Sequence, residues 1–143
     1  MATVDCFMLC DGVQVANGKL FILGGGWSRL TTSTLPVQRS LELAVRVVVP
    51  WLETNRPISF KLHLEDEDGR ALLPEPVTAE VRVGRPATLA DGSDQSVPFV
   101  LRIGNANLAR SGRYILSLRQ GEETVARTTF DLVVTEPGKR VQS

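Results

Sequence analysis

The chain has 143 residues, a length that fits one domain, and its sixteen basic residues balance sixteen acidic ones. A net charge of zero gives no long-range field that would gather a polyanion, which argues against nucleic acid or an anionic membrane as partner. The first residues lack a signal-peptide pattern, and no later run approaches the ~20 apolar residues of a membrane span. We therefore expect a cytoplasmic protein.

The chain opens with a predicted β-hairpin whose turn is Asn17-Gly18. This dipeptide is the strongest short hairpin signal, because both central positions of the favoured two-residue turn need positive φ. The turn predicts that the segment 4–15 folds back onto residues 20–23. The glycines 24–26 that follow predict a bulge or sharp bend, and an anion-binding nest is the less favoured alternative because the spacing is not that of a P-loop.

The only two cysteines, Cys6 and Cys10, lie on the first predicted strand. Their Cα atoms should be about 13 Å apart at ~3.3 Å per residue. A disulfide tolerates no more than about 7 Å, so we expect two reduced, buried thiols. A metal site would need more ligands than a chain with one histidine offers, and the sequence predicts neither a metal nor a cofactor.

Short segments that alternate apolar and polar residues make up most of the remaining chain, with the period of two that a strand requires. They cover residues 41–49, 58–65, 77–83, 97–103, 114–118 and 126–134, and residues 30–34 form a strand or a crossing connection. Polar stretches at 50–57, 84–95 and 104–112 are predicted connections. The pattern predicts a single all-β domain over residues 1–135, an antiparallel β-sandwich of about eight strands, with a flexible tail at 136–143.

The segment Leu108 to Tyr114, with the sequence Leu-Ala-Arg-Ser-Gly-Arg-Tyr, resembles the tyrosine corner of immunoglobulin-like and fibronectin type III sandwiches. In those domains the phenol hydroxyl bonds back to the upstream backbone. Leu116 stands where antibody domains have their second cysteine. The resemblance implies an immunoglobulin-like core without the disulfide.

The opening carries a second resemblance, on Cys10-Asp11-Gly12, Asn17-Gly18-Lys19-Leu20 and Leu23-Gly24-Gly25-Gly26-Trp27, with Val49-Pro50-Trp51 and Thr54-Asn55 later. These motifs are similar to those of a family of small, functionally uncharacterised bacterial proteins that begin with this hairpin and end in a Gly-Arg-Tyr corner. The resemblance implies a cytosolic bacterial β-sandwich and assigns no catalytic residue.

Catalytic chemistry finds little support in the sequence. His63 is the only imidazole, it faces solvent on its predicted strand, and no nucleophile or second base can be tied to it. The acidic run 66–68 is read as a hairpin turn, because a calcium site would need carboxylates from a second loop at that end. Trp27 and Trp51 are each either a core anchor or a partly exposed platform. We expect no catalytic residues and no enzyme.

A candidate binding site follows from strand direction. If successive strands run antiparallel, the connections after Val49 and Val83 lie at the same end of the sandwich. Long polar loops are often functional, and a tryptophan among polar groups suits a protein or a sugar. The candidate residues are Trp51, Thr54, Asn55, Arg56, Arg85, Thr88, Asp91 and Gln95.

The leading interpretation of function is a protein-interaction or assembly module that presents loops or an edge strand to an unknown protein partner, with a homo-oligomer left open. The alternative is a sandwich that binds a small, carbohydrate-like ligand through Trp51, and a hydrolase is the third reading. A tryptophan that folds inward to plug the end of the sandwich would leave this end without a binding role.

Overall fold

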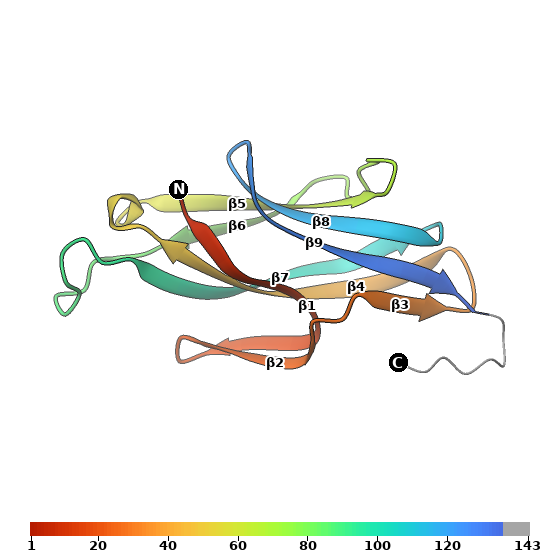
Figure 1. Cartoon of the computed structure of the whole chain (residues 1–143), viewed down its shortest axis with the longest axis horizontal. Coiled ribbons are helices and arrows are strands. Elements are labelled where there is room, and N and C mark those ends of the chain that lie inside the picture. Colours follow the sequence, from red (N-terminus) through yellow and green to blue (C-terminus); the bar gives the residue numbers. More distant parts are fainter. Residues whose placement is uncertain (136–143) are drawn as a thin grey trace.

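The computed structural model describes residues 1–135, and the predicted tail at 136–143 lies outside them. The described chain forms a β-sandwich with one short 3₁₀ turn (Figure 1). Its elements are β1 (Thr3–Ala16), β2 (Lys19–Gly25), β3 (Arg29–Thr32), β4 (Val37–Val49), η1 (Trp51–Glu53), β5 (Pro57–Asp66), β6 (Val77–Arg82), β7 (Gln95–Leu108), β8 (Gly112–Gln120) and β9 (Glu123–Val134). The sequence predicted about eight strands, and residues 1–135 hold nine.

The strands form two sheets. Sheet A has the order β2-β1-β4-β7, and sheet B has the order β3-β9-β8-β5-β6. All neighbours pair antiparallel except β3 and β9, which run parallel. The series β1-β4-β7 opposite β9-β8-β5 reproduces the A-B-E and G-F-C orders of immunoglobulin domains. The prediction of an all-β sandwich with an immunoglobulin-like core is confirmed.

The hydrophobic core lies between the sheets and follows the predicted alternation. The inward side chains of β4 from Leu41 to Val49 are all buried, and those of β5 from Ile58 to Leu64 face them from sheet B. Burying one such side chain stabilises a fold by roughly 1.5–3 kcal/mol, so the alternation in these two strands is enough to fix which face points inward.

The predicted connection at 104–112 is wrong over most of its length, because β7 continues to Leu108. Gly104, Asn105 and Asn107 suggested a turn, but Ala106 and Leu108 are buried and keep the strand in register with the start of β4. The burial of these two apolar side chains outweighs the weak strand propensity of their neighbours.

The tyrosine corner is present at the start of β8. The Tyr114 ring is 3% exposed and stacks on Phe130 with 5.3 Å between ring centroids. Its hydroxyl donates to the Arg110 carbonyl at 2.6 Å and accepts from the Arg110 N–H at 3.4 Å. The corner thus ties the short connection before β8 to the core.

Replacing Tyr114 with phenylalanine should remove these two hydrogen bonds and leave the ring packing intact. We expect Tyr114→Phe to lower the free energy of unfolding by about 0.5–1.5 kcal/mol, and by more if the Arg110 carbonyl stays buried without a donor. Urea denaturation measures the change. A denaturation midpoint identical to that of the parent chain would show that the hydroxyl does not stabilise the corner.

The opening hairpin has the predicted turn and bend, but it is shorter than predicted, because only residues 10–16 of β1 pair with β2 while residues 3–10 pair with β4. Asn17 and Gly18 have φ of 52° and 70°, as a type I′ turn requires. Gly24 and Gly26 have φ of 57° and 83°, and the Gly26 N–H donates to the Leu9 carbonyl at 2.7 Å. In Figure 1 the hairpin projects below the sandwich, and the chain then crosses to β3 in sheet B.

Candidate functional site

The two loops predicted to share one end of the sandwich do meet. The Asn55 N–H donates to the Val83 carbonyl at 2.7 Å, which joins the loop after β4 to the end of β6. Residues 71–76 add only an isolated bridge between Glu65 and Ala71, so the predicted alternation of loop ends holds. The two loops therefore lie at the same end of the sandwich, as strand direction predicted, and binding at this end stays a prediction.

Arg85 organises this end. Its guanidinium lies 4.0 Å from the centroid of the Trp51 ring, a cation–π distance. Its Nε donates to the Thr54 hydroxyl, and its Nη2 donates to the Trp51 carbonyl at 2.8 Å. The Thr54 hydroxyl donates to the same carbonyl at 2.6 Å. These contacts cap η1 and cover the indole with a side chain of the protein itself, which weighs against a stacking platform for a sugar.

The other predicted site residues do not join this cluster. Gln95 is the first residue of β7, and its Nε2 donates to the Gly84 carbonyl. Four others are exposed, and their side chains form no hydrogen bond within residues 1–135: Asn55, Arg56, Thr88 and Asp91. The end therefore brings Trp51, Thr54 and Arg85 together as a loop clamp and leaves the remaining polar side chains unassembled.

The two tryptophans differ in environment. Trp27 is half-buried against the main core and contacts Phe130 edge to face at 5.7 Å, so it is a core anchor. Trp51 is half-buried under Arg85 instead.

His63 lies on the outward face of β5, as predicted, but it is half-buried. Ser117 faces it across the ladder with β8, and no hydrogen bond joins the two side chains. Burial lowers the pKa of His63, the neighbouring charges of Arg119 and Lys61 lower it further, and Glu65 opposes them. The lowered pKa favours the neutral imidazole at pH 7, and within residues 1–135 no hydrogen bond joins His63 to a nucleophilic side chain.

The lowered pKa of His63 predicts a pH-dependent contribution to stability. Below its ordinary pKa of about 6.5 the unfolded chain takes up a proton before the folded chain does. The contribution is therefore complete above pH ~6.5 and is lost as the pH falls toward the folded pKa. We expect the free energy of unfolding of the parent to fall relative to that of His63→Gln as the pH drops through this window. Urea unfolding from pH 5 to pH 8 measures both values. A difference that is constant across the series would contradict the shift.

The two cysteines are free thiols, as the strand spacing predicted, and Cys10 is buried as expected, whereas Cys6 is only half-buried. Burial is the main cause that raises the pKa of Cys6 and of Cys10, so both are weak nucleophiles at neutral pH. Among residues 1–135 no group of three or more His, Cys, Asp or Glu side chains is placed to hold a metal ion. In the same part of the chain, no helix has the length and apolar character to cross a membrane.

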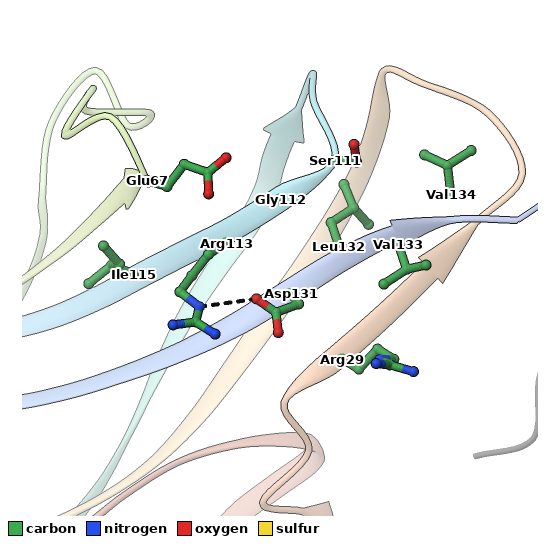
Figure 2. Close-up of a pocket in the computed structure, with 10 residues that line it drawn as sticks. All are labelled: Arg29, Glu67, Ser111, Gly112, Arg113, Ile115, Asp131, Leu132, Val133 and Val134. Carbon is green, nitrogen blue, oxygen red and sulfur yellow. Dashed lines mark hydrogen bonds and ion pairs between the residues drawn. The ribbon is translucent and has the colours of Figure 1, made fainter.

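An open pocket of about 810 Å³ lies at the end of the sandwich opposite Trp51, along β8 and β9 (Figure 2). Figure 2 shows Arg113 directed at Asp131, and their Nε and Oδ1 atoms are 3.2 Å apart. Both side chains are about half exposed, and such pairs contribute roughly 0.2–1 kcal/mol. Two arginines and two carboxylates line the pocket, so it favours neither an anion nor a cation.

The outer face of sheet A, which points away from the main core, carries another apolar surface. A second apolar cluster forms there, and it joins Cys6, Met8, Cys10, Ala44 and Val100 to Val13, Leu20 and Ile22 of the hairpin. Ala44 is completely buried although it points away from the main core. The hairpin therefore covers this face as a partial third layer.

An ion pair on sheet A holds the hairpin in place. Glu42 Oε1 accepts from Arg102 Nε at 2.8 Å, and Glu42 Oε2 accepts from the Val13 N–H at 3.1 Å. Arg102 Nη2 donates to the Val13 carbonyl at 3.2 Å. Both backbone groups of Val13 thus bond side chains that rise from β4 and β7, rather than a neighbouring strand.

The bonds of Val13 reveal which backbone groups of β2 are free. Val13 stands opposite Ile22, so this pair is a non-hydrogen-bonded pair of the antiparallel ladder. Because pair types alternate, Phe21 and Leu23 bond to β1, while the N–H and C=O groups of Leu20 and Ile22 point to the outer edge. No other strand of residues 1–135 pairs with that edge.

The exposed face of β2 is apolar. Phe21 is 56% exposed and Leu23 is 74% exposed, and both line a groove of about 600 Å³ beside Gln14 and Glu42. We name Lys19–Gly25, with its free edge and these two side chains, the hairpin edge.

The other sheet edges in the described chain are protected. β7 carries Pro98, β6 turns Thr78, Glu80 and Arg82 to solvent, and β3 has only four residues. Two more stretches lack a partner strand on one side, residues 3–9 of β1 and 123–130 of β9. The first carries the charged Asp5 and a bulge between Val4 and Cys6, and the second carries the exposed charge of Arg127. Proline, charge and short length are the usual means of blunting an edge strand. The hairpin edge has none of them over residues 20–23, which distinguishes it from the edges of β3, β6 and β7.

The sequence predicted the hairpin but not its role as a surface. The alternation of Leu20 and Ile22 with Phe21 and Leu23 shows two apolar faces, and a hairpin can bury only one of them against its own sheet. A strand that is apolar on both faces and directly follows an Asn-Gly turn is therefore the sequence signal that could have predicted this surface.

The chain is similar to a solved immunoglobulin-like structure and matches a protein family. A crystal structure of an immunoglobulin-like protein from Pseudomonas aeruginosa shares 12% identity and a TM-score of 0.39, over 92% of this chain and 96% of that chain. At this TM-score the similarity adds nothing to the strand order described above. No curated protein matches the sequence significantly. A family model matches residues 5–133, and the chain therefore belongs to DUF6941, a family of unknown function.

Proposed function

We propose that this chain is a non-enzymatic protein-interaction module of the cytoplasm, which binds another polypeptide through the hairpin edge. One observation carries the proposal: β2 combines an unpaired backbone edge with two exposed apolar side chains, while the other edges are blunted. Addition of a strand to such an edge gives affinity through main-chain hydrogen bonds and specificity through the alternate side chains.

Capture from a lysate of the native host tests the site when it is made dependent on the hairpin. The bait is the full chain, as parent, as the double variant Phe21→Ser with Leu23→Ser, and as Leu52→Ser. Leu52 is the matched control, because it is 82% exposed and lies in η1 at the Trp51 end. We expect the proteins recovered by the parent to be kept by Leu52→Ser and lost by the double variant, with similar melting temperatures.

The same experiment separates the two candidate ends of the sandwich. Asp91→Ala and Thr88→Ala alter exposed polar side chains of the loop predicted as a site. If the recovered proteins depend on these residues and not on Phe21 and Leu23, the proposed surface is wrong and the Trp51 end carries the interaction.

A further inference from the structure

We propose that the partner at the hairpin edge is a second copy of this chain, paired antiparallel through β2 about a two-fold axis at Ile22. The inference rests on the proposed function and names its partner. An interface across a two-fold axis uses the same patch on both copies, so the patch must be complementary to itself. The hairpin edge meets this condition in its backbone, its apolar side chains and its charges.

The register of the pair must bring the free N–H and C=O groups of the two β2 strands opposite each other. With Ile22 opposite its own copy, Leu20 faces Gly24 of the second copy. Ile22 and Leu20 are the residues whose N–H and C=O groups point to the free edge, so the Ile22 pair can form the closely bonded pair of an antiparallel ladder. A register shifted by one residue would oppose these groups to Phe21 and Leu23, whose backbone already bonds β1.

The register must also bring the exposed apolar side chains, Phe21 and Leu23, against those of the second copy. In the same register Phe21 stands opposite Leu23 of the second copy, and Leu23 stands opposite the other Phe21. These are the non-bonded positions of the ladder, where the side chains are closest. Both exposed apolar groups of each copy are therefore covered by those of the other.

The charge condition concerns the two ends of the hairpin. Lys19 lies at the tip, and Asp11 lies at the base, where its carboxylate packs against Gly24. Neither side chain forms an ion pair within residues 1–135. Antiparallel pairing brings the tip of each hairpin to the base of the other, so the end of the edge that carries Lys19 meets the end that carries Asp11. Lys19 itself faces Gly25 of the second copy, and no like charges oppose each other.

Sedimentation equilibrium of the purified chain tests the pairing over a series of concentrations. We expect the parent to reach the dimer mass, and Phe21→Lys or Leu23→Glu alone to stay at half that mass. A mixture of the two variants should associate again, because Lys at position 21 then faces Glu at position 23 and the remaining Phe21 and Leu23 still meet. Leu52→Glu, the matched control, should dimerise like the parent.

The register has its own test in oxidative cross-linking with copper phenanthroline. Phe21→Cys mixed with Leu23→Cys should give a cross-linked dimer, since positions 21 and 23 are directly opposite, with Cα atoms about 4.5 Å apart. Each variant alone and the parent, whose thiols lie beneath the hairpin, should give little product. Efficient cross-linking of Phe21→Cys alone would place the two-fold axis at Phe21 and overturn the proposed register.

Two outcomes overturn the second copy as partner. A parent chain that stays monomeric at every concentration would do so, and hairpin-dependent capture of another protein would then still support the proposed function. A dimer that persists unchanged in Phe21→Lys and Leu23→Glu would place the contact elsewhere on the chain.

Discussion

Phe130→Ala should lower the free energy of unfolding by about 3–5 kcal/mol, the usual cost of truncating a buried aromatic side chain. Phe130 is 1% exposed and contacts both Tyr114 and Trp27, so its removal leaves a cavity at the meeting point of the tyrosine corner and the crossing to β3. Such a loss is a large part of the 5–15 kcal/mol that typically stabilises a domain. Urea denaturation followed by tryptophan fluorescence measures it.

The control is Phe21→Ala, the same substitution at a phenylalanine on the hairpin edge. Because that ring is largely exposed, we expect a change within about 0.5 kcal/mol at concentrations where the chain is monomeric. Equal losses for the two variants would mean that Phe21 belongs to the core of the monomer, which the hairpin account excludes.

Glu42→Ala should release the hairpin from sheet A. The substitution removes the acceptor of the Val13 N–H and the partner of Arg102, and hydrogen bonds to charged groups contribute about 1.5–3 kcal/mol. Since Arg102 is 59% exposed, the ion pair itself accounts for little of this. We expect a lower free energy of unfolding and faster hydrogen exchange at the Val13 amide.

Asp5→Ala provides the matched comparison. Asp5 pairs with Arg46 at 2.8 Å on the same outer face of sheet A, but neither side chain forms a hydrogen bond or ion pair with the paired hairpin at residues 10–25. Its loss should cost about 0.2–1 kcal/mol and leave exchange at Val13 unchanged. If Glu42→Ala and Asp5→Ala behave alike, Glu42 does not anchor the hairpin.

Local sequence signals were enough to predict the strands that bury one face and expose the other. The alternation at 58–65 and the Asn-Gly turn at 17–18 each depend on neighbouring residues alone, and both have the predicted structure. The end of β7 depends instead on pairing with residues 37–39, 67 to 71 positions away in the sequence, and the glycine and asparagines before Leu108 concealed it.

The Trp51 end and the hairpin edge both depend on contacts between residues far apart in the sequence, which local patterns do not predict. Strand direction predicted that the loops near Trp51 and Arg85 meet, but not that Arg85 would cover the indole. The hairpin was predicted, whereas its position over sheet A is fixed by Glu42 and Arg102, which are distant from Val13 in the sequence. The free edge of β2 follows from that position and could not be inferred from local pattern.

Amide hydrogen exchange at Leu20 and Ile22, resolved by NMR over a series of protein concentrations, tests the hairpin edge most directly. In the dilute monomer the N–H groups of Leu20 and Ile22 should exchange freely, while those of Phe21 and Leu23, which bond β1, should be protected. As the concentration rises, we predict that Leu20 and Ile22 become protected and that the amides at 85–94 do not change. Exchange at Leu20 and Ile22 that is independent of concentration, with new protection at 85–94 instead, would contradict the account.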